Sequence, residues 1–290
     1  MAQRAASHGC EGRVGARAAA LSAAVLVLLL GGSARAAPSE PAAREQVDGL
    51  EVQRGDDRSV APDRRPFAFA VDPSTPAPGT LAYGYAAGVG SGISAARPIP
   101  VVLQSAGAAS HLSVGYGLTE RIAPILEVTE TGANGATVTS ATVGVKVRLT
   151  GAQAPVRAAV LLGALHEGAS GANGMWARAA ASWGTGPILV TANGYAERVL
   201  APGRDSLDYA LMAGASWRLV EGIRAGAEWV AQDVEELVAL GAEGGARQAA
   251  GPSIAFDLDH GRYHVVAAAL FGIGALSPTA LVRIGLLRSF

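Results

Sequence analysis

The feature that most constrains this chain is an alternation of apolar and polar residues that recurs from Thr80 to the end. It is clearest between Leu207 and Leu219, where the odd positions read Leu, Tyr, Leu, Ala, Ala, Trp and Leu, and the even positions Asp, Ala, Met, Gly, Ser and Arg. A two-residue turn, Val220-Glu221, then leads into a second alternating run. A period of two is the signature of a β-strand with two different faces, and so short a turn reverses the chain direction. The sequence therefore predicts antiparallel strands.

The same pattern predicts about twelve strands of about 10 to 13 residues, with ten or fourteen as alternatives. The predicted strands are 80–89, 109–118, 121–131, 137–149, 154–166, 174–183, 187–198, 207–219, 222–232, 247–258, 262–273 and 279–290. Strands of soluble proteins average about five or six residues, whereas a tilted strand that crosses a membrane needs about nine to eleven. The lengths therefore favour an all-β, closed, antiparallel up-and-down transmembrane β-barrel, because lipid leaves no room for unpaired sheet edges.

The connections between these strands differ in length at the two ends of the sheet. Short turns at 150–153, 184–186, 220–221 and 259–261 alternate with longer links near 167–173, 199–206 and 233–246. The link near 132–136 departs from this trend. Outer-membrane barrels have short periplasmic turns and longer external loops. An even number of strands would place both ends of the barrel domain, residues 79–290, on the short-turn side.

The first 36 residues have the features of a cleavable secretory signal peptide. Arginines precede an apolar run from Ala18 to Leu30, and Ala34-Arg35-Ala36 has the small-x-small pattern of a cleavage site. The apolar run is shorter than the roughly 17 to 25 residues of a transmembrane helix. The only cysteine, Cys10, lies before that run. The exported chain is therefore expected to contain no disulfide and no cysteine ligand.

Residues 37–78 are rich in Pro, Ala and charged residues and show no sustained period. Such a composition predicts irregular structure. Two interpretations follow, a periplasmic leader or a plug inside the barrel, and the leader is preferred.

Aromatic residues on the apolar face are expected to form girdles at the two membrane interfaces. Most lie near the short-turn ends of their strands, and Trp229 lies near the opposite ends. The predicted girdle residues are Tyr116, Trp183, Trp217, Trp229, Phe256 and Tyr263.

The last predicted strand has a pattern of residues that resembles a known signal. Val282, Ile284 and Leu286 alternate ahead of the terminal Phe290, on the same face of the last strand. This pattern resembles the C-terminal assembly signal of bacterial outer-membrane β-barrel proteins, and Arg288 departs from it. The resemblance covers residues 80–290 as a class and points to no particular family. It implies an outer-membrane location, lipid around the barrel and folding by the barrel assembly machinery.

The opposite face is predicted to line the lumen and is rich in glycine and charge. The candidate lumen-lining residues are Arg148, Arg157, Arg178, Arg218, Arg224, Glu228 and Arg283. Counting every predicted inward position, basic side chains exceed acidic ones by about three, which favours anions in a pore. The leading hypothesis is therefore a narrow channel or binding barrel for a small, anionic solute.

Three alternatives stay open at this point. The first is a plugged barrel that serves as an anchor without transport. The second is a lipid hydrolase, because His111-Leu112-Ser113 has a His-x-Ser pattern, although both side chains are predicted to face the lumen and no acid partner is evident. The third is a secreted soluble β-sandwich. The histidine spacing predicts no metal site, no cofactor is expected, and a net charge of −1 gives no indication of nucleic-acid binding.

Overall fold

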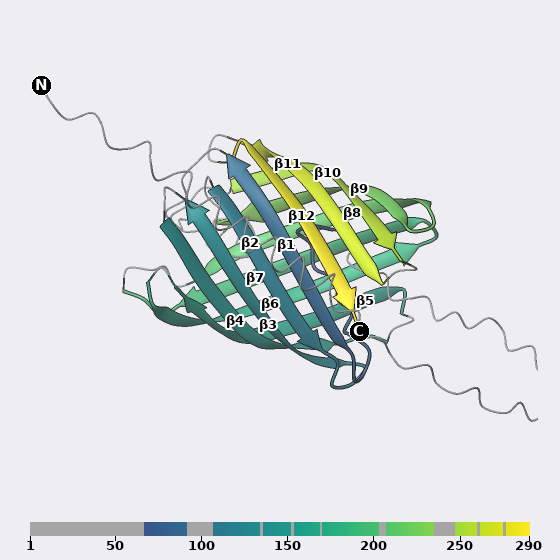
Figure 1. Cartoon of the computed structure of the whole chain (residues 1–290), viewed down its shortest axis with the longest axis horizontal. Helices are drawn as coiled ribbons and strands as arrows, with labels where there is room; N and C mark the ends of the chain where they lie inside the picture. The colour runs from purple at the N-terminus through teal and green to yellow at the C-terminus, as the bar shows by residue number, and fades with distance from the viewer. Residues whose placement is uncertain are drawn as a thin grey trace, which may run out of the picture.

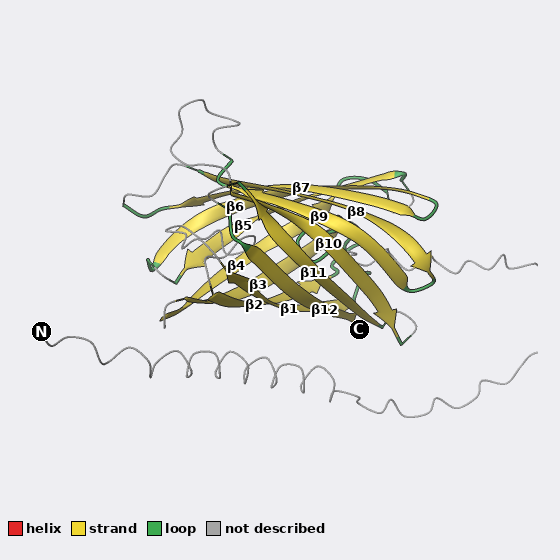
Figure 2. Ribbon diagram, turned by 90° about the horizontal axis from the view of Figure 1, so that it is seen from above, coloured by secondary structure: helices red, strands yellow, loops and turns green. Residues whose placement is uncertain are grey.

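The computed structural model describes residues 67–91, 107–133, 136–151, 154–168, 170–202, 207–234, 247–259, 262–274 and 277–290. These residues form twelve strands: β1 Leu81–Ser91, β2 Gly107–Tyr116, β3 Ile122–Ala133, β4 Ala136–Arg148, β5 Val156–Glu167, β6 Ala172–Thr185, β7 Ile188–Val199, β8 Asp208–Val220, β9 Ile223–Gln232, β10 Arg247–Leu258, β11 Tyr263–Ile273 and β12 Ala280–Ser289. Every regular element in this part of the chain is a strand (Figure 2).

The strands close into one antiparallel barrel. Each strand pairs with its neighbours in sequence, and β1 pairs with β12 from Ala82 opposite Ser289 to Ser91 opposite Ala280 (Figure 1). The predicted up-and-down barrel of twelve strands is confirmed, and no alternative strand number is needed. One predicted turn is displaced: Val220 still pairs with Ile223, so the turn consists of Glu221 and Gly222.

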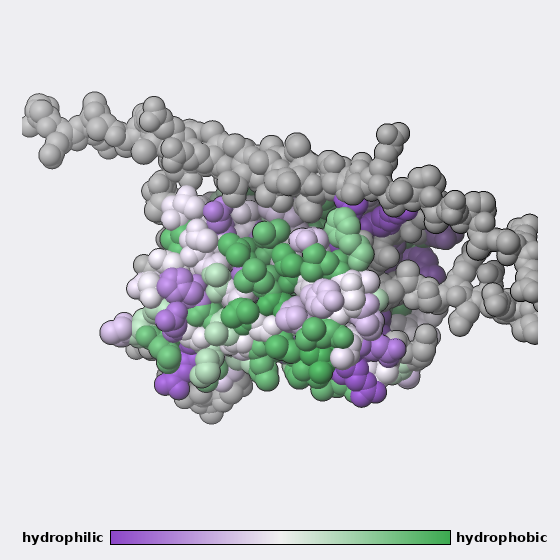
Figure 3. Space-filling model, turned by 60° about the horizontal axis from the view of Figure 1, so that its bottom comes forward, coloured by the Kyte–Doolittle hydropathy of each residue, from purple (hydrophilic) through white to green (hydrophobic). Residues whose placement is uncertain are grey.

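The two faces of the wall differ as the alternation predicts. In β6, Met175 and Trp183 are 61% and 45% exposed on the outer side, whereas Trp176, Arg178 and Ser182 are buried on the inner side. A soluble protein rarely exposes a continuous apolar surface of this kind. Figure 3 shows apolar side chains gathered on the outer surface between more hydrophilic patches. Hydrocarbon is the environment that this surface fits.

The exposed large apolar side chains lie on all sides of the barrel. They include Val89, Leu126, Val143, Leu162, Met175, Leu211, Ile254, Phe271 and Ile284. Such a distribution surrounds the wall with apolar surface, as a bilayer requires.

Within the described residues, no helix is both long enough and apolar enough to cross a membrane.

The aromatic residues near the short-turn end make contacts with one another across the β1–β12 closure. The rings of Tyr83 and Phe290 meet edge to face with centroids 5.5 Å apart. Arg288, which departs from the apolar pattern, lies with its guanidinium 4.9 Å from the ring centre of Tyr263 and 4.0 Å from that of Phe290. Cation–π contacts therefore accommodate the charge within the aromatic rim.

The remaining predicted girdle residues occupy the outer side of the wall. Tyr116, Trp183 and Trp217 are exposed near the short-turn ends of their strands, and Phe256 pairs with Ile223 at the start of β9. Trp229 lies toward the opposite end of β9, where its indole N–H donates to the side-chain oxygen of Gln248 on β10. This placement matches the predicted heights. Their role as a membrane girdle stays a prediction.

The buried apolar core lies inside the barrel. It contains inward side chains of the wall together with Phe67 and Phe69, which precede the first strand. Its largest members on the wall are Leu161, Leu165, Trp176, Leu189, Tyr195, Met212, Leu270 and Leu281. The interior is therefore not the purely polar or glycine surface that the alternation suggests, because part of it packs against a segment of the same chain.

Introducing an arginine in the middle of the outer face tests whether lipid covers that face. Leu162 is 60% exposed at the centre of β5, and we expect Leu162→Arg to lower the free energy of unfolding by about 2–4 kcal/mol. The control is Leu149→Arg, at an exposed position on the short-turn rim, because a charge near the interface costs only about 0–1 kcal/mol. Urea unfolding in lipid vesicles measures both values. Equal losses at the two positions would contradict a membrane-spanning wall.

Candidate functional site in the barrel lumen

Residues 67–78, hereafter the inner segment, form neither strand nor helix; they run inside the barrel and reach its short-turn rim, where Ala77 and Pro78 are exposed. Glu228 of β9 holds their first part. Its carboxylate accepts the backbone N–H groups of Ala68 and Phe69, both at 2.8 Å, and that of Ala70 at 3.3 Å. Glu228 is only 2% exposed. One buried carboxylate thus satisfies three consecutive backbone donors, which are strong charge-assisted hydrogen bonds.

Asn193 of β7, two strands from β9 in the wall, holds the next residue of the inner segment. Its side-chain oxygen accepts the N–H of Val71 at 2.5 Å, and its amide nitrogen donates to the carbonyl of Val71 at 2.9 Å. This pair of bonds imitates the pairing between two strands. At the far end of the inner segment, the hydroxyl of Thr75 donates to the carbonyl of Glu120 in the β2–β3 turn. The inner segment is therefore fixed to several parts of the wall.

Asp72 is the only charged residue of the inner segment and is 2% exposed. One of its oxygens, Oδ1, accepts the N–H of Ser74 at 2.6 Å. The other, Oδ2, lies 3.7 Å from Nη2 of Arg157 on β5. The ammonium of Lys146 on β4 donates to the carbonyl of Asp72 at 2.6 Å. Two basic residues of the wall thus face the one acidic residue of the inner segment.

Phe67 and Phe69 anchor the inner segment in the apolar core. A Cβ added at Gly214 of β8 would lie 2.6 Å from the Phe67 ring, so this glycine makes room for the phenylalanine. The guanidinium of Arg283 on β12 lies 5.2 Å from the centre of the Phe69 ring. The Phe67 ring thus packs against β8, and the Phe69 ring lies beside Arg283 of β12.

Arg178 of β6 lies beside two aromatic rings, Trp176 and Tyr195, which stack on each other. Its guanidinium is 5.8 Å from the ring centre of Trp176 and 5.3 Å from that of Tyr195. The indole ring of Trp176 itself lies over the inward glycines Gly144 and Gly163. Arg178 is 2% exposed, yet its Nε and Nη2 atoms have no hydrogen-bond partner among the described residues. A buried charge with unused donors is a candidate contact for a ligand.

The structure places the predicted lumen residues at different positions along the barrel. Arg157, Arg178, Glu228 and Arg283 surround the inner segment or the cavity beside it. Arg224 instead donates to the Ser216 hydroxyl and to the carbonyl of Pro187, which fixes the wall near a turn.

Two further arginines of the predicted set lie toward the short-turn end. Arg218 is exposed at the rim, and Arg148 is half-buried on β4 with its Nε lacking a hydrogen-bond partner in the described part of the chain. The residues that sequence reasoning did not single out are Asn193, Asp72, Phe67 and Phe69. The FAFAVD stretch ahead of the first strand was an available signal, because its alternating phenylalanines have no place in a solvated leader.

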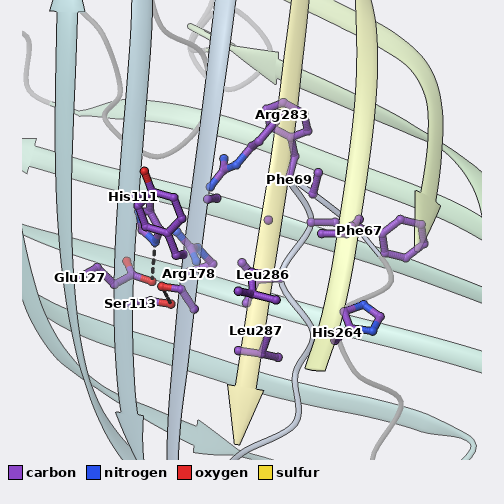
Figure 4. A pocket seen from close by; sticks show the side chains of 18 residues that line it. Phe67, Phe69, His111, Ser113, Glu127, Arg178, His264, Arg283, Leu286 and Leu287 are labelled. Carbon is purple, nitrogen blue, oxygen red and sulfur yellow. Dashed lines mark hydrogen bonds and ion pairs between the residues drawn. The ribbon is translucent and has the colours of Figure 1, made fainter. Parts of the chain in front are cut away.

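A cavity lies between the inner segment and the wall formed by β1, β2, β11 and β12. Its volume is about 60 Å³, enough for a few water molecules. Figure 4 shows His111, Ser113, Glu127 and Arg178 on one side of it and Phe67, Phe69 and His264 on the other. With the inner segment in place, the cavity is too small for a sugar-sized solute.

The His-x-Ser pair faces the lumen, as predicted. His111 contacts Thr129 through Nδ1 at 3.2 Å and Glu127 through Nε2 at 3.8 Å, so an acidic partner exists. The hydroxyl of Ser113 donates to the carbonyl of Gly84 at 3.4 Å. Both side chains thus contact the wall on the side away from lipid, which gives no support to a lipid hydrolase.

His264 faces inward and pairs with Asp257 at 2.8 Å. Among the described residues, no group of three or more His, Cys, Asp or Glu side chains is arranged to hold a metal ion.

No protein-family model and no curated protein matches this sequence. Solved structures do. The KdgM porin in complex with disordered oligogalacturonate has a TM-score of 0.50 at 8% identity, and the match covers 73% of this chain and 99% of KdgM. An outer membrane channel from Pseudomonas putida F1 has a TM-score of 0.50 at 12% identity, covering 78% of this chain and 99% of that channel. The chain therefore has the fold of bacterial outer-membrane β-barrel channels, and the predicted resemblance to that class is confirmed.

Removing the Glu228 carboxylate tests how the inner segment is held. We expect Glu228→Ala to leave three backbone donors unsatisfied and to release the inner segment at least about tenfold more often, since a hydrogen bond to a charged group contributes about 1.5–3 kcal/mol. Maleimide labelling of a cysteine introduced at buried Ala70 measures the release.

The matched control is Glu130→Ala, which removes the same charge from β3 at a position between the inward residues Thr129 and Thr131. Labelling rates that rise equally in both variants would show that general loosening of the barrel, and not Glu228, exposes Ala70.

Proposed function

We propose that this protein is a channel-type β-barrel of the bacterial outer membrane whose lumen is held closed by residues 67–78. The observation that carries the proposal is the set of three backbone hydrogen bonds from the inner segment to the buried Glu228. In the part of the chain that the structure describes, a length of chain lies inside the lumen, and the cavities found beside it are small. Export by the predicted signal peptide, residues 1–36, and folding by the barrel assembly machinery belong to the same proposal.

The contacts of the inner segment suit a movable closure. The barrel wall is complete without it, because all twelve strands pair with one another and β1 pairs with β12. The inner segment adds no strand to the sheet and is held by side chains alone at Glu228, Asn193 and Lys146. Its departure would leave a closed barrel whose interior carries both polar and apolar side chains. The lumen would then admit a small solute.

The second candidate is a permanently plugged barrel that serves as an anchor. The observation in its favour is the close packing of Phe67 and Phe69 in the apolar core, at 3% and 7% exposure. Such burial stabilises the occupied lumen by about 1.5–3 kcal/mol for each ring. To open the lumen, a solute or a partner would have to offset this burial together with the hydrogen bonds to Glu228 and Asn193.

Conductance across a planar bilayer distinguishes the two candidates. We expect the chain without its signal peptide to show rare, brief openings, and a variant that also lacks residues 37–78 to show stable open steps several times larger. A second variant keeps the full chain: Gly214→Leu places a side chain where the Phe67 ring lies and should raise the open fraction. Silent bilayers with every variant, from barrels that migrate as folded on a gel, would favour the anchor.

A further inference from the structure

We propose that four basic residues of the lumen, Lys146, Arg148, Arg157 and Arg178, form a binding site for a solute that carries several carboxylates. We infer further that Asp72 occupies part of this site when the lumen is closed, as an internal substitute for that solute. The four residues are hereafter the basic wall. The inference rests on the proposed function, because it names the class of solute that the opened lumen would take.

Strand register brings the basic wall together. Lys146 and Arg148 lie two residues apart on β4, so both face the lumen. Arg148 is opposite Ala159 of β5, two residues from Arg157 on the same side. Lys146 is opposite Leu161, which in turn is opposite Arg178 of β6. Four cations thus lie on one side of three adjacent strands, with backbones about 4.8 Å apart.

The inner segment neutralises this surface incompletely. Its single carboxylate, Asp72, gives one oxygen to its own chain at Ser74, and the other has no hydrogen bond. The remaining contact, 3.7 Å to Arg157, is longer than the 2.7–2.9 Å of a charge-assisted hydrogen bond. Asp72 therefore lies in the site, but its carboxylate makes no hydrogen bond to the basic wall.

Two arginines of the basic wall have hydrogen-bond donors without an acceptor in the part of the chain that the structure describes. Nε of Arg148, and Nε and Nη2 of Arg178, have no hydrogen-bond partner among the described residues. Arg178 is nearly completely buried, so water does not readily replace the missing acceptor. Buried guanidinium groups require acceptors, and their planar forks bind carboxylates in pairs of parallel hydrogen bonds. A ligand with more than one carboxylate would satisfy donors that Asp72 leaves unmet.

Citrate is the probe for this site. Isothermal titration calorimetry follows its binding to the detergent-solubilised chain without the predicted signal peptide, at fixed ionic strength. We expect Asp72→Asn to tighten citrate binding at least about tenfold relative to the unchanged chain, because the competing carboxylate is gone. Adding Arg157→Gln or Arg148→Gln to Asp72→Asn should weaken binding again by about tenfold.

The matched control combines Asp72→Asn with Arg198→Gln. Arg198 lies on β7 between the buried Glu197 and Val199, so the substitution removes the same charge from the outer side of the wall. Its citrate affinity should equal that of Asp72→Asn alone. Gel mobility of heated and unheated samples verifies that each variant is folded, and the two arginine positions provide separate tests should one variant fail to fold.

Two outcomes would overturn the inference. Equal affinity in the unchanged chain and in Asp72→Asn would refute the role of Asp72, and equal affinity in the arginine variants and the Arg198 control would refute the basic wall. Calorimetry detects binding inside the lumen whether or not ions then cross the barrel. A barrel that binds citrate as expected but never conducts would therefore contradict the proposed channel and leave the binding site standing.

Discussion

The structure depends on the absence of water from hydrocarbon, which obliges every backbone polar group of the wall to find its partner within the protein. The twelve strands meet this requirement only because β12 returns to β1. An open sheet with the same strands would expose two unpaired edges to lipid. Closure in turn separates the residues of each strand into an outer, apolar set and an inner set that faces no lipid. Tyr83 and Phe290 pack together at the short-turn rim, at the place where β1 meets β12.

Closure also creates an interior of fixed perimeter that must be filled by water or by protein. In this chain the inner segment fills it, and the glycines of the wall acquire particular roles. Gly214 leaves room for the Phe67 ring, and Gly144 with Gly163 leaves room for Trp176. The same alternation that places apolar side chains in lipid thus shapes the lumen. The occupied lumen is the feature on which the proposed closed channel rests.

The candidate site was predictable in part. The period of two identifies Arg157, Arg178 and Glu228 as inward residues, because the side on which a strand residue points depends only on its position in the alternation. Their partners could not be predicted in this way. Glu228 binds Ala70, which is 158 positions away in the sequence, and a local period carries no information on such a contact. Arg224 illustrates the difference, since it faces inward as expected but binds the wall itself.

By itself, the sequence determined the strands, their antiparallel order and the division of each strand into two faces, because these follow from local periodicity and short turns. It also determined that lipid suits the outer face, because apolar residues alternate around the whole wall. Only the tertiary structure decided that the barrel closes with twelve strands, that residues 67–78 lie inside it and that Asp72 faces Lys146 and Arg157. The physical reason is that closure and occupancy depend on contacts between residues far apart in the sequence, which no repeating pattern specifies.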